Sequence, residues 1–181
     1  MKQRHLKLAF GLLAAATLAT CAAPDATGVS NSVSSQTSQD TTHLLGSTPT
    51  LVTCPTDATV SSTALITPLG GTLNAGGTIV FVPPHAVLLP VTMTLTVPAS
   101  NYMEIDVSVE GETNFLFQIP ITVSLSYARC SRSEIGPNPS TVYHIDSDTH
   151  ELLEAMPTLD NKLTQTALFR TGHLSGYALA N

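Results

Sequence analysis

The sequence predicts an all-β fold, an antiparallel β-sandwich over residues 61–181 that follows a signal peptide and a polar tether. Apolar and polar residues alternate with period two through several segments, which is typical of strands with one buried and one solvated face. Gly and Pro turn signals recur about every 8–12 residues, as they do in sandwiches of short strands. Beyond the N-terminal segment no long stretch has a helical period, so we expect no helical layer.

Residues 1–20 have the features of an export signal peptide. A basic start precedes an apolar run over residues 8–18, and its basic residues are Lys2, Arg4 and Lys7. This run is too short for a transmembrane helix, which needs about 20 apolar residues. We therefore expect the segment to direct export and not to remain as a membrane span.

The end of this segment, Leu18-Ala19-Thr20-Cys21, resembles a lipobox, the motif of bacterial lipoproteins. In that motif the cysteine is acylated and becomes the mature N-terminus. Cys21 is therefore the predicted lipidation site, and the outer membrane or another part of the cell envelope is the predicted location. Thr20 departs from the motif, which prefers Gly, Ala or Ser there. The alternative is ordinary cleavage near Ala19 or Ala22, which would give a soluble periplasmic or secreted protein.

Residues 21–60 are predicted to be a polar tether. They are rich in Ser and Thr and have no apolar period. Such a segment cannot bury enough apolar surface to offset the entropy of ordering. Its most polar part runs from Ala22 to about Thr50, and a polar coil of about 30 residues would have an end-to-end distance near 30 Å.

Loss of the signal peptide would make the chain more acidic. The whole chain has 7 basic and 13 acidic residues, and removing three basic residues leaves 4 − 13 = −9. Recognition of a phosphate backbone requires several clustered cations, so we expect no nucleic-acid partner. The same argument disfavours anionic lipid headgroups, and leaves the acyl chains on Cys21 as the membrane attachment.

Two cysteines, Cys54 and Cys130, remain beyond the signal segment. In an oxidising compartment an isolated pair most simply forms one disulfide. Closing so long a loop would stabilise the fold by about 4–5 kcal/mol. Two free, buried thiols are the alternative.

The first predicted strands lie around two glycine pairs and cover residues 65–67, 72–74 and 78–82. Gly76 and Gly77 suit a tight hairpin between the last two strands, because such turns need positive φ. Residues 79–82 are apolar at every position, which predicts a central strand covered on both faces. Pro83 and Pro84 lack a backbone donor, so the strand must end there.

Seven further strands are predicted, over residues 91–97, 103–109, 115–127, 141–145, 151–155, 163–169 and 174–179. Pro120 interrupts the third of them, which indicates an edge position or a bulge. Acidic residues alternate along the second and continue past its end. We expect them to form a solvated acidic face made of Glu104, Asp106, Glu110 and Glu112.

Several segments resemble the ZU-five domain, a β-sandwich of zona-occludens proteins, ankyrins and netrin receptors. The resemblance is carried by Ile66-Thr67-Pro68-Leu69-Gly70-Gly71-Thr72-Leu73, Ile79-Val80-Phe81-Val82-Pro83-Pro84-His85-Ala86, Phe117-Gln118-Ile119-Pro120-Ile121-Thr122-Val123 and Thr171-Gly172-His173-Leu174-Ser175-Gly176-Tyr177. His85 stands where the family has Gly. If the backbone there needs positive φ, His can adopt it at a cost.

The resemblance implies a binding or structural module, since ZU-five domains mostly act in interactions, although a fold does not determine a function. One member group, the death-domain scaffold proteins, cleaves itself within His-Phe-Ser, to which His173-Leu174-Ser175 is similar. In that chemistry Ser175 Oγ attacks the preceding carbonyl carbon, His173 acts as base, and backbone strain drives the acyl shift. The alternative is that His173 caps a turn and Ser175 is an ordinary strand residue.

We expect no metal site and no cofactor. The candidate ligands gather near one hairpin loop and are His144, Asp146, Asp148, His150 and Glu151. The loop lacks the Gly and Glu of a calcium hand, and two imidazoles are too few for zinc. Asp in a turn accepts hydrogen bonds from nearby backbone without any metal. Phosphate-loop, dinucleotide and Gly-x-Ser-x-Gly motifs are absent from the sequence.

The sequence therefore predicts a non-enzymatic, lipid-anchored module of the cell envelope that binds a protein or a glycan. Two alternatives belong to other classes: self-cleavage through His173 and Ser175, and a small exported hydrolase.

Overall fold

The computed structural model describes residues 48–181, so the predicted signal peptide, Cys21 and most of the predicted tether lie outside the described residues. Within residues 48–181 the chain forms thirteen strands and one four-residue helix, α1 (Arg132–Ile135). The all-β prediction is confirmed. In this part of the chain no helix has the length and apolar character needed to cross a membrane.

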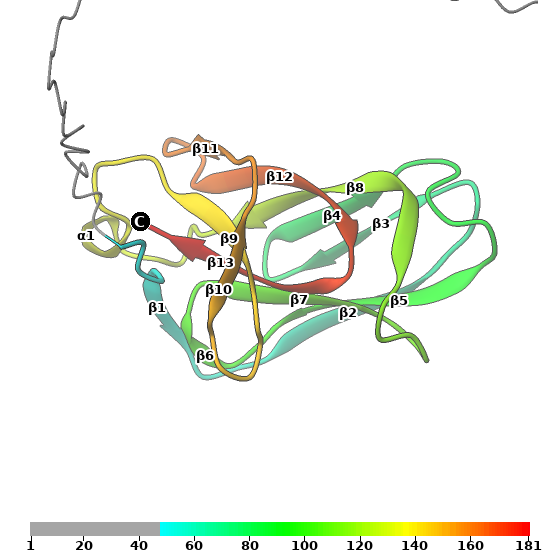
Figure 1. Cartoon of the computed structure of the whole chain (residues 1–181). Coiled ribbons are helices and arrows are strands. Elements are labelled where there is room, and N and C mark those ends of the chain that lie inside the picture. The colour runs from blue at the N-terminus through cyan, green and yellow to red at the C-terminus, as the bar shows by residue number, and fades with distance from the viewer. Residues whose placement is uncertain (1–47) are drawn as a thin grey trace, which may run out of the picture. The chain divides into compact units, whose positions relative to one another are not determined.

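Two antiparallel sheets form the layers of a sandwich (Figure 1). The first has six strands, in the order β10 (Leu152–Ala155), β9 (Thr141–Ile145), β13 (Ser175–Ala180), β7 (Glu104–Val109), β5 (Val91–Val97) and β2 (Val60–Ile66). The second has five, in the order β11 (Leu159–Asn161), β12 (Thr166–His173), β8 (Leu116–Ser126), β4 (Thr78–Val82) and β3 (Gly71–Ala75). The predicted β-sandwich is thus confirmed.

The inner faces of the two sheets share one apolar core. The period-two pattern sets which side chains face inward, so Met93 and Leu95 of β5 and Val123 and Leu125 of β8 are all fully buried. Each such side chain stabilises the fold by about 1.5–3 kcal/mol through the removal of apolar surface from water. The largest buried side chains include Tyr127, Phe169 and Tyr177.

Strand β4 differs from its prediction. Val80 and Val82 are fully buried, but Ile79 is 40% exposed and Phe81 is 49% exposed. The strand is central in its sheet, between β8 and β3, and the other sheet covers only one of its faces. The prediction that both faces are covered was therefore wrong, because a run of apolar residues does not reveal whether a second layer lies over the outer face.

The turns follow the predicted chemistry. Gly76 and Gly77 have φ angles of 56° and 83° in the hairpin between β3 and β4. Strand β4 ends at Val82, before the two prolines. His85 has φ of 65°, so this position adopts the left-handed backbone that favours Gly. The β12–β8 pairing shifts register opposite the segment that contains Pro120, as a bulge would require.

The sandwich begins before residue 61. Strand β1 (Thr53–Thr56) pairs with β6 (Ser100–Tyr102) in a small third sheet, and Val52 is buried in the core. The final part of the predicted tether is therefore folded. Its strand pairs with β6, and Val52 packs in the core, so the contacts are with residues far away in the sequence.

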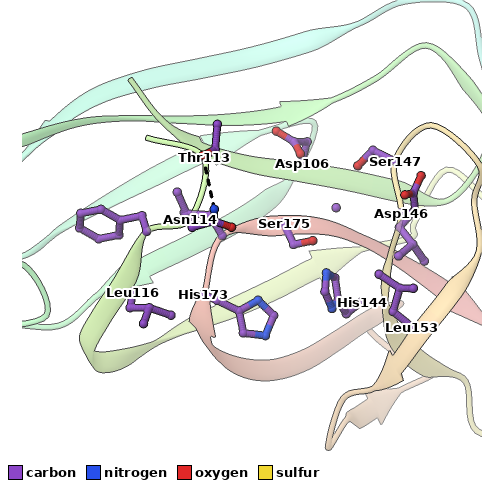
Figure 2. Close-up of a pocket in the computed structure, with 14 residues that line it drawn as sticks. Asp106, Thr113, Asn114, Leu116, His144, Asp146, Ser147, Leu153, His173 and Ser175 are labelled. Carbon is purple, nitrogen blue, oxygen red and sulfur yellow. Dashed lines mark hydrogen bonds between the residues drawn. The ribbon is translucent and has the colours of Figure 1, made fainter. Parts of the chain in front are cut away.

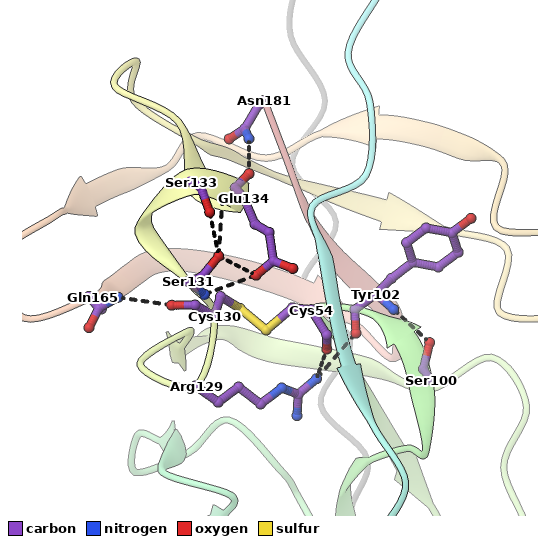
Figure 3. Close-up of a disulfide and its surroundings, with 10 residues drawn as sticks. All are labelled: Cys54, Ser100, Tyr102, Arg129, Cys130, Ser131, Ser133, Glu134, Gln165 and Asn181. Carbon is purple, nitrogen blue, oxygen red and sulfur yellow. Dashed lines mark hydrogen bonds between the residues drawn. A yellow bond between two sulfur atoms is a disulfide. The ribbon is translucent and has the colours of Figure 1, made fainter.

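The predicted disulfide between Cys54 and Cys130 is present (Figure 3). Its Cα atoms are 5.1 Å apart and its residues are 76 positions apart in sequence. The neighbouring Arg129 donates from Nη2 to the carbonyl oxygens of Cys54 and Tyr102, at 3.3 and 3.2 Å. The segment after β8 is thus joined to β1 and β6 by one covalent bond and two hydrogen bonds.

Candidate functional site

The loop between β9 and β10 is held by turn chemistry, as predicted for Asp in a turn. The Asp146 Oδ1 atom accepts hydrogen bonds from the backbone N–H groups of Thr149 and Asp148, at 2.8 and 3.0 Å. These bonds, that from Thr149 first, hold the pKa of the Asp146 carboxyl below its usual value. The carboxylate considered as a calcium ligand is therefore engaged by its own loop.

In the same loop, His150 faces the carboxylate of Glu104. The Nε2 atom of His150 lies 3.2 Å from Oε2 of Glu104, and its ring packs beside Tyr102. Glu104 is only 6% exposed, so the prediction of a solvated acidic face is wrong at this position. A buried carboxylate requires such a partner. Asp106 is half-buried, and burial raises the pKa of its carboxyl.

A pocket lies beside the connection from β12 to β13, which carries the chain from one sheet to the other (Figure 2). Its volume is about 530 Å³. Its polar lining includes Asp106, His144, Asp146, Ser147, His173 and Ser175. The two residues of the self-cleavage hypothesis thus line one pocket, together with a histidine from β9.

Within this pocket His173 is held by Tyr177. The Nδ1 atom of His173 lies 3.4 Å from the Tyr177 hydroxyl, which donates to the His173 carbonyl oxygen at 2.8 Å. Burial raises the pKa of Tyr177 to about 12, so the hydroxyl stays protonated at neutral pH. Within residues 48–181 no hydrogen bond joins His173 to Ser175, and self-cleavage stays a prediction.

A group of three possible metal ligands also meets here, although the sequence predicted no metal site. One ligand atom from each of His144, Glu154 and His173 lies within 4.8 Å of the other two. The two imidazole rings have centroids 4.9 Å apart, and Glu154 Oε2 is 4.0 Å from His173 Nε2. Burial, and then the nearby His173, lower the pKa of His144, which keeps this imidazole neutral at pH 7.

Sequence reasoning missed this group because its members come from three strands. The hairpin of β9 and β10 was predicted, and its register sets Glu154 opposite His144, so that pairing was the available signal. His173 belongs to the other sheet, and only the packing of the two sheets brings it within reach.

The outer face of the five-stranded sheet is a second candidate site. One row of the sheet register contains Leu159, Leu168, Ser124 and Ile79, and the adjacent row contains Arg170, Thr122 and Phe81. We call these seven residues the apolar face. Its members Leu159, Leu168 and Phe81 are 72%, 39% and 49% exposed. Strands β11, β12 and β4 therefore present large apolar side chains to solvent on this face, and β8 contributes Ser124 and Thr122 between β12 and β4.

The outer face of the six-stranded sheet has a different character. On β2 and β5 the facing hydroxyls bond each other across the strands, Ser61 with Thr96 at 3.1 Å and Thr63 with Thr94 at 2.9 Å. Leu65, at the end of β2, is the exposed apolar residue of this row. At β2 and β5 this outer face is thus more polar than the apolar face.

Comparison of the chain with protein-family models gives no match, and comparison with curated proteins gives none either.

Proposed function

We propose that this protein is a non-enzymatic binding module of the cell envelope, anchored by a lipid on Cys21, that binds a partner protein through its apolar face. The observation that carries this proposal is the exposure of Ile79 and Phe81 on β4 and of Leu168 on β12, on one face of the sheet, with Ser124 and Thr122 of β8 between them. Contiguous exposed apolar surface on a folded domain marks an interaction site. The resemblance to ZU-five domains, which mostly act in interactions, supports the same function.

The chemistry of the apolar face fits a protein better than a glycan. Sugar recognition relies on polar groups placed to meet the hydroxyls of the ligand. The centre of a protein interface is instead apolar, with aromatic residues and Arg enriched. Phe81 and Arg170 are residues of these types, and they lie in the same row of the sheet.

Arg170 predicts a second property of the partner protein, an acidic side chain at the interface. It is the one charged member of the apolar face, on a chain whose net charge is −6. Among residues 48–181, no carboxylate lies within ion-pair distance of its guanidinium. We therefore expect the partner to place an acidic side chain opposite Arg170, surrounded by apolar residues that cover Ile79 and Phe81.

Photo-crosslinking in intact cells tests this function. A photoreactive phenylalanine analogue is placed at position 81 of the full chain, and the matched control carries it at position 63, on the hydroxyl-rich face. We expect one reproducible envelope protein to be captured from position 81 and not from position 63. Equal capture from both positions, or none, would overturn the proposal.

A charge reversal makes the test specific to this face. Arg170→Glu, combined with the analogue at position 81, should abolish the crosslink if an acidic partner group faces Arg170. The side chain is exposed, so the fold should be retained, which thermal unfolding of the purified variant checks. An undiminished crosslink in a folded Arg170→Glu variant would show that the captured protein does not use this face.

A further inference from the structure

We propose that His144, His173 and Glu154 form a binding site for a zinc ion. The site goes beyond the proposed function, and it shares no residue with the apolar face. Two imidazoles and one carboxylate are a recurrent zinc ligand set, in which water or another ligand takes the fourth position. The three ligand atoms already lie within 4.8 Å of one another.

The backbone fixes two of the three ligands. His144 lies within β9, which is paired on one side with β10 and on the other with β13. His173 ends β12 in the opposite sheet, so the two imidazoles approach each other from the two layers of the sandwich. Sites built on strands hold their ligands more accurately than sites built on loops.

The orientation of His173 is set by a neighbour, as in known metal sites. Its Nδ1 atom faces the Tyr177 hydroxyl at 3.4 Å, which leaves Nε2 facing Glu154. Histidines that bind metals usually use one ring nitrogen for the ion and the other for a hydrogen bond that fixes the tautomer. Thr171 Oγ1, 2.7 Å from the same hydroxyl, holds Tyr177 in turn.

Closure onto an ion requires only a small movement. Ligands at about 2.0–2.1 Å from a tetrahedral zinc ion lie about 3.3 Å from one another. The side chain of Glu154 is 61% exposed, so it can rotate toward the two imidazoles without disturbing the core. The fourth position would be open to solvent or to the pocket lined by His144 and His173.

Titration of the metal-free full chain, purified without a histidine tag, with zinc ions is the direct test. Isothermal calorimetry should give one saturable site. Glu154→Ala and His144→Asn should each weaken zinc binding at least 10-fold. Tyr177→Phe, which keeps all three ligands, should weaken it about 10- to 100-fold, as loss of an orienting partner does. Millimolar calcium should not compete, because imidazole ligands favour zinc over calcium.

Two matched variants keep the test specific. Glu151→Ala removes an exposed carboxylate from the same hairpin, and His85→Asn removes an exposed histidine that lies outside the group of three. Both should bind zinc as tightly as the unmodified chain. The absence of a saturable site, or an equal loss of affinity in Glu154→Ala and Glu151→Ala, would overturn the proposal. If His144→Asn fails to fold, the zinc affinities of Glu154→Ala and Glu151→Ala still test the site, because both side chains are exposed.

Discussion

The Tyr127 hydroxyl donates a hydrogen bond to the carboxylate of Asp160, and both side chains are buried, with 0% and 2% exposure. The same carboxylate accepts a bond from the Ser140 backbone N–H at 2.8 Å and pairs with Lys162 at 3.1 Å. Burial, and then the bond to Asp160, raise the pKa of Tyr127. One carboxylate thus joins three segments that are separated in sequence.

Removal of this hydroxyl should destabilise the protein. Tyr127→Phe leaves the buried Asp160 carboxylate with one donor fewer, and we expect the free energy of unfolding to fall by about 1–3 kcal/mol. Urea unfolding measures the change. Tyr143→Phe is the matched control, because Tyr143 is less buried, and it should change stability by less than about 0.5 kcal/mol. Equal effects of the two variants would contradict the role given to the Tyr127–Asp160 bond.

Loss of the disulfide should have a larger effect. The Cys54–Cys130 bond joins residues that are 76 positions apart in sequence, and the double variant Cys54→Ala/Cys130→Ala should lose about 4 kcal/mol of stability. Urea unfolding with and without reductant measures the same difference in the unmodified chain. Reductant should leave the double variant unchanged. Two free thiols in the mass spectrum of the non-reduced protein would contradict the bond itself.

The sandwich could be predicted because its strands have local signatures. The alternation in β5, and in β7 except at Glu104, the glycines of the β3–β4 hairpin and the prolines after Val82 each act over a few residues, and each was confirmed. The outer face of β4 could not be predicted, because the exposure of Phe81 depends on whether another layer covers it. That information lies in the packing of the sheets and not in the strand.

The candidate site was predictable only in part. His173 and Ser175 were selected from a short resemblance, and the structure places both at one pocket. The approach of His144 and Glu154 to His173 depends on the register of one hairpin and on the contact between two sheets. Glu104 illustrates the same limit, since the alternation assigns it to a wet face, whereas the loop that carries His150 covers it.

Replacement of His85 by glycine should relieve the backbone strain at this position. A non-glycine residue at φ of 65° has a conformational strain of about 1–2 kcal/mol, which glycine would remove. Glycine also increases the conformational entropy of the unfolded chain, and this offsets part of the stabilisation. We expect His85→Gly to raise the free energy of unfolding by about 0.5–1 kcal/mol in urea. His150→Gly is the contrast, because φ there is also positive, at 59°, but the change removes the partner of buried Glu104. His150→Gly should destabilise, and a loss in His85→Gly would contradict the strain argument.

Asp106 should make stability depend on pH. Burial raises its folded-state pKa above the ordinary value of 3.8, so the unfolded chain releases this proton at a lower pH than the folded chain. The contribution of Asp106 to stability therefore falls as pH rises from about 4 through the folded-state pKa, and remains unfavourable above it. Asp106→Asn should raise the free energy of unfolding at pH 7 and leave it nearly unchanged at pH 3. The exposed Asp57→Asn is the control, and an equal gain in it at pH 7 would contradict the burial argument.

The purified chain should remain uncleaved at His173-Leu174-Ser175. The acyl shift needs a base at the Ser175 hydroxyl and strain at the preceding peptide, but His173 directs Nδ1 toward Tyr177 at 3.4 Å. Within residues 48–181 the non-glycine residues with positive φ are His85, His150 and Gln165, none of them at this corner. Intact mass after prolonged incubation measures the outcome. Release of the peptide from Ser175 to Asn181, abolished by Ser175→Ala, would contradict the expectation and favour the self-cleaving alternative over a purely binding module.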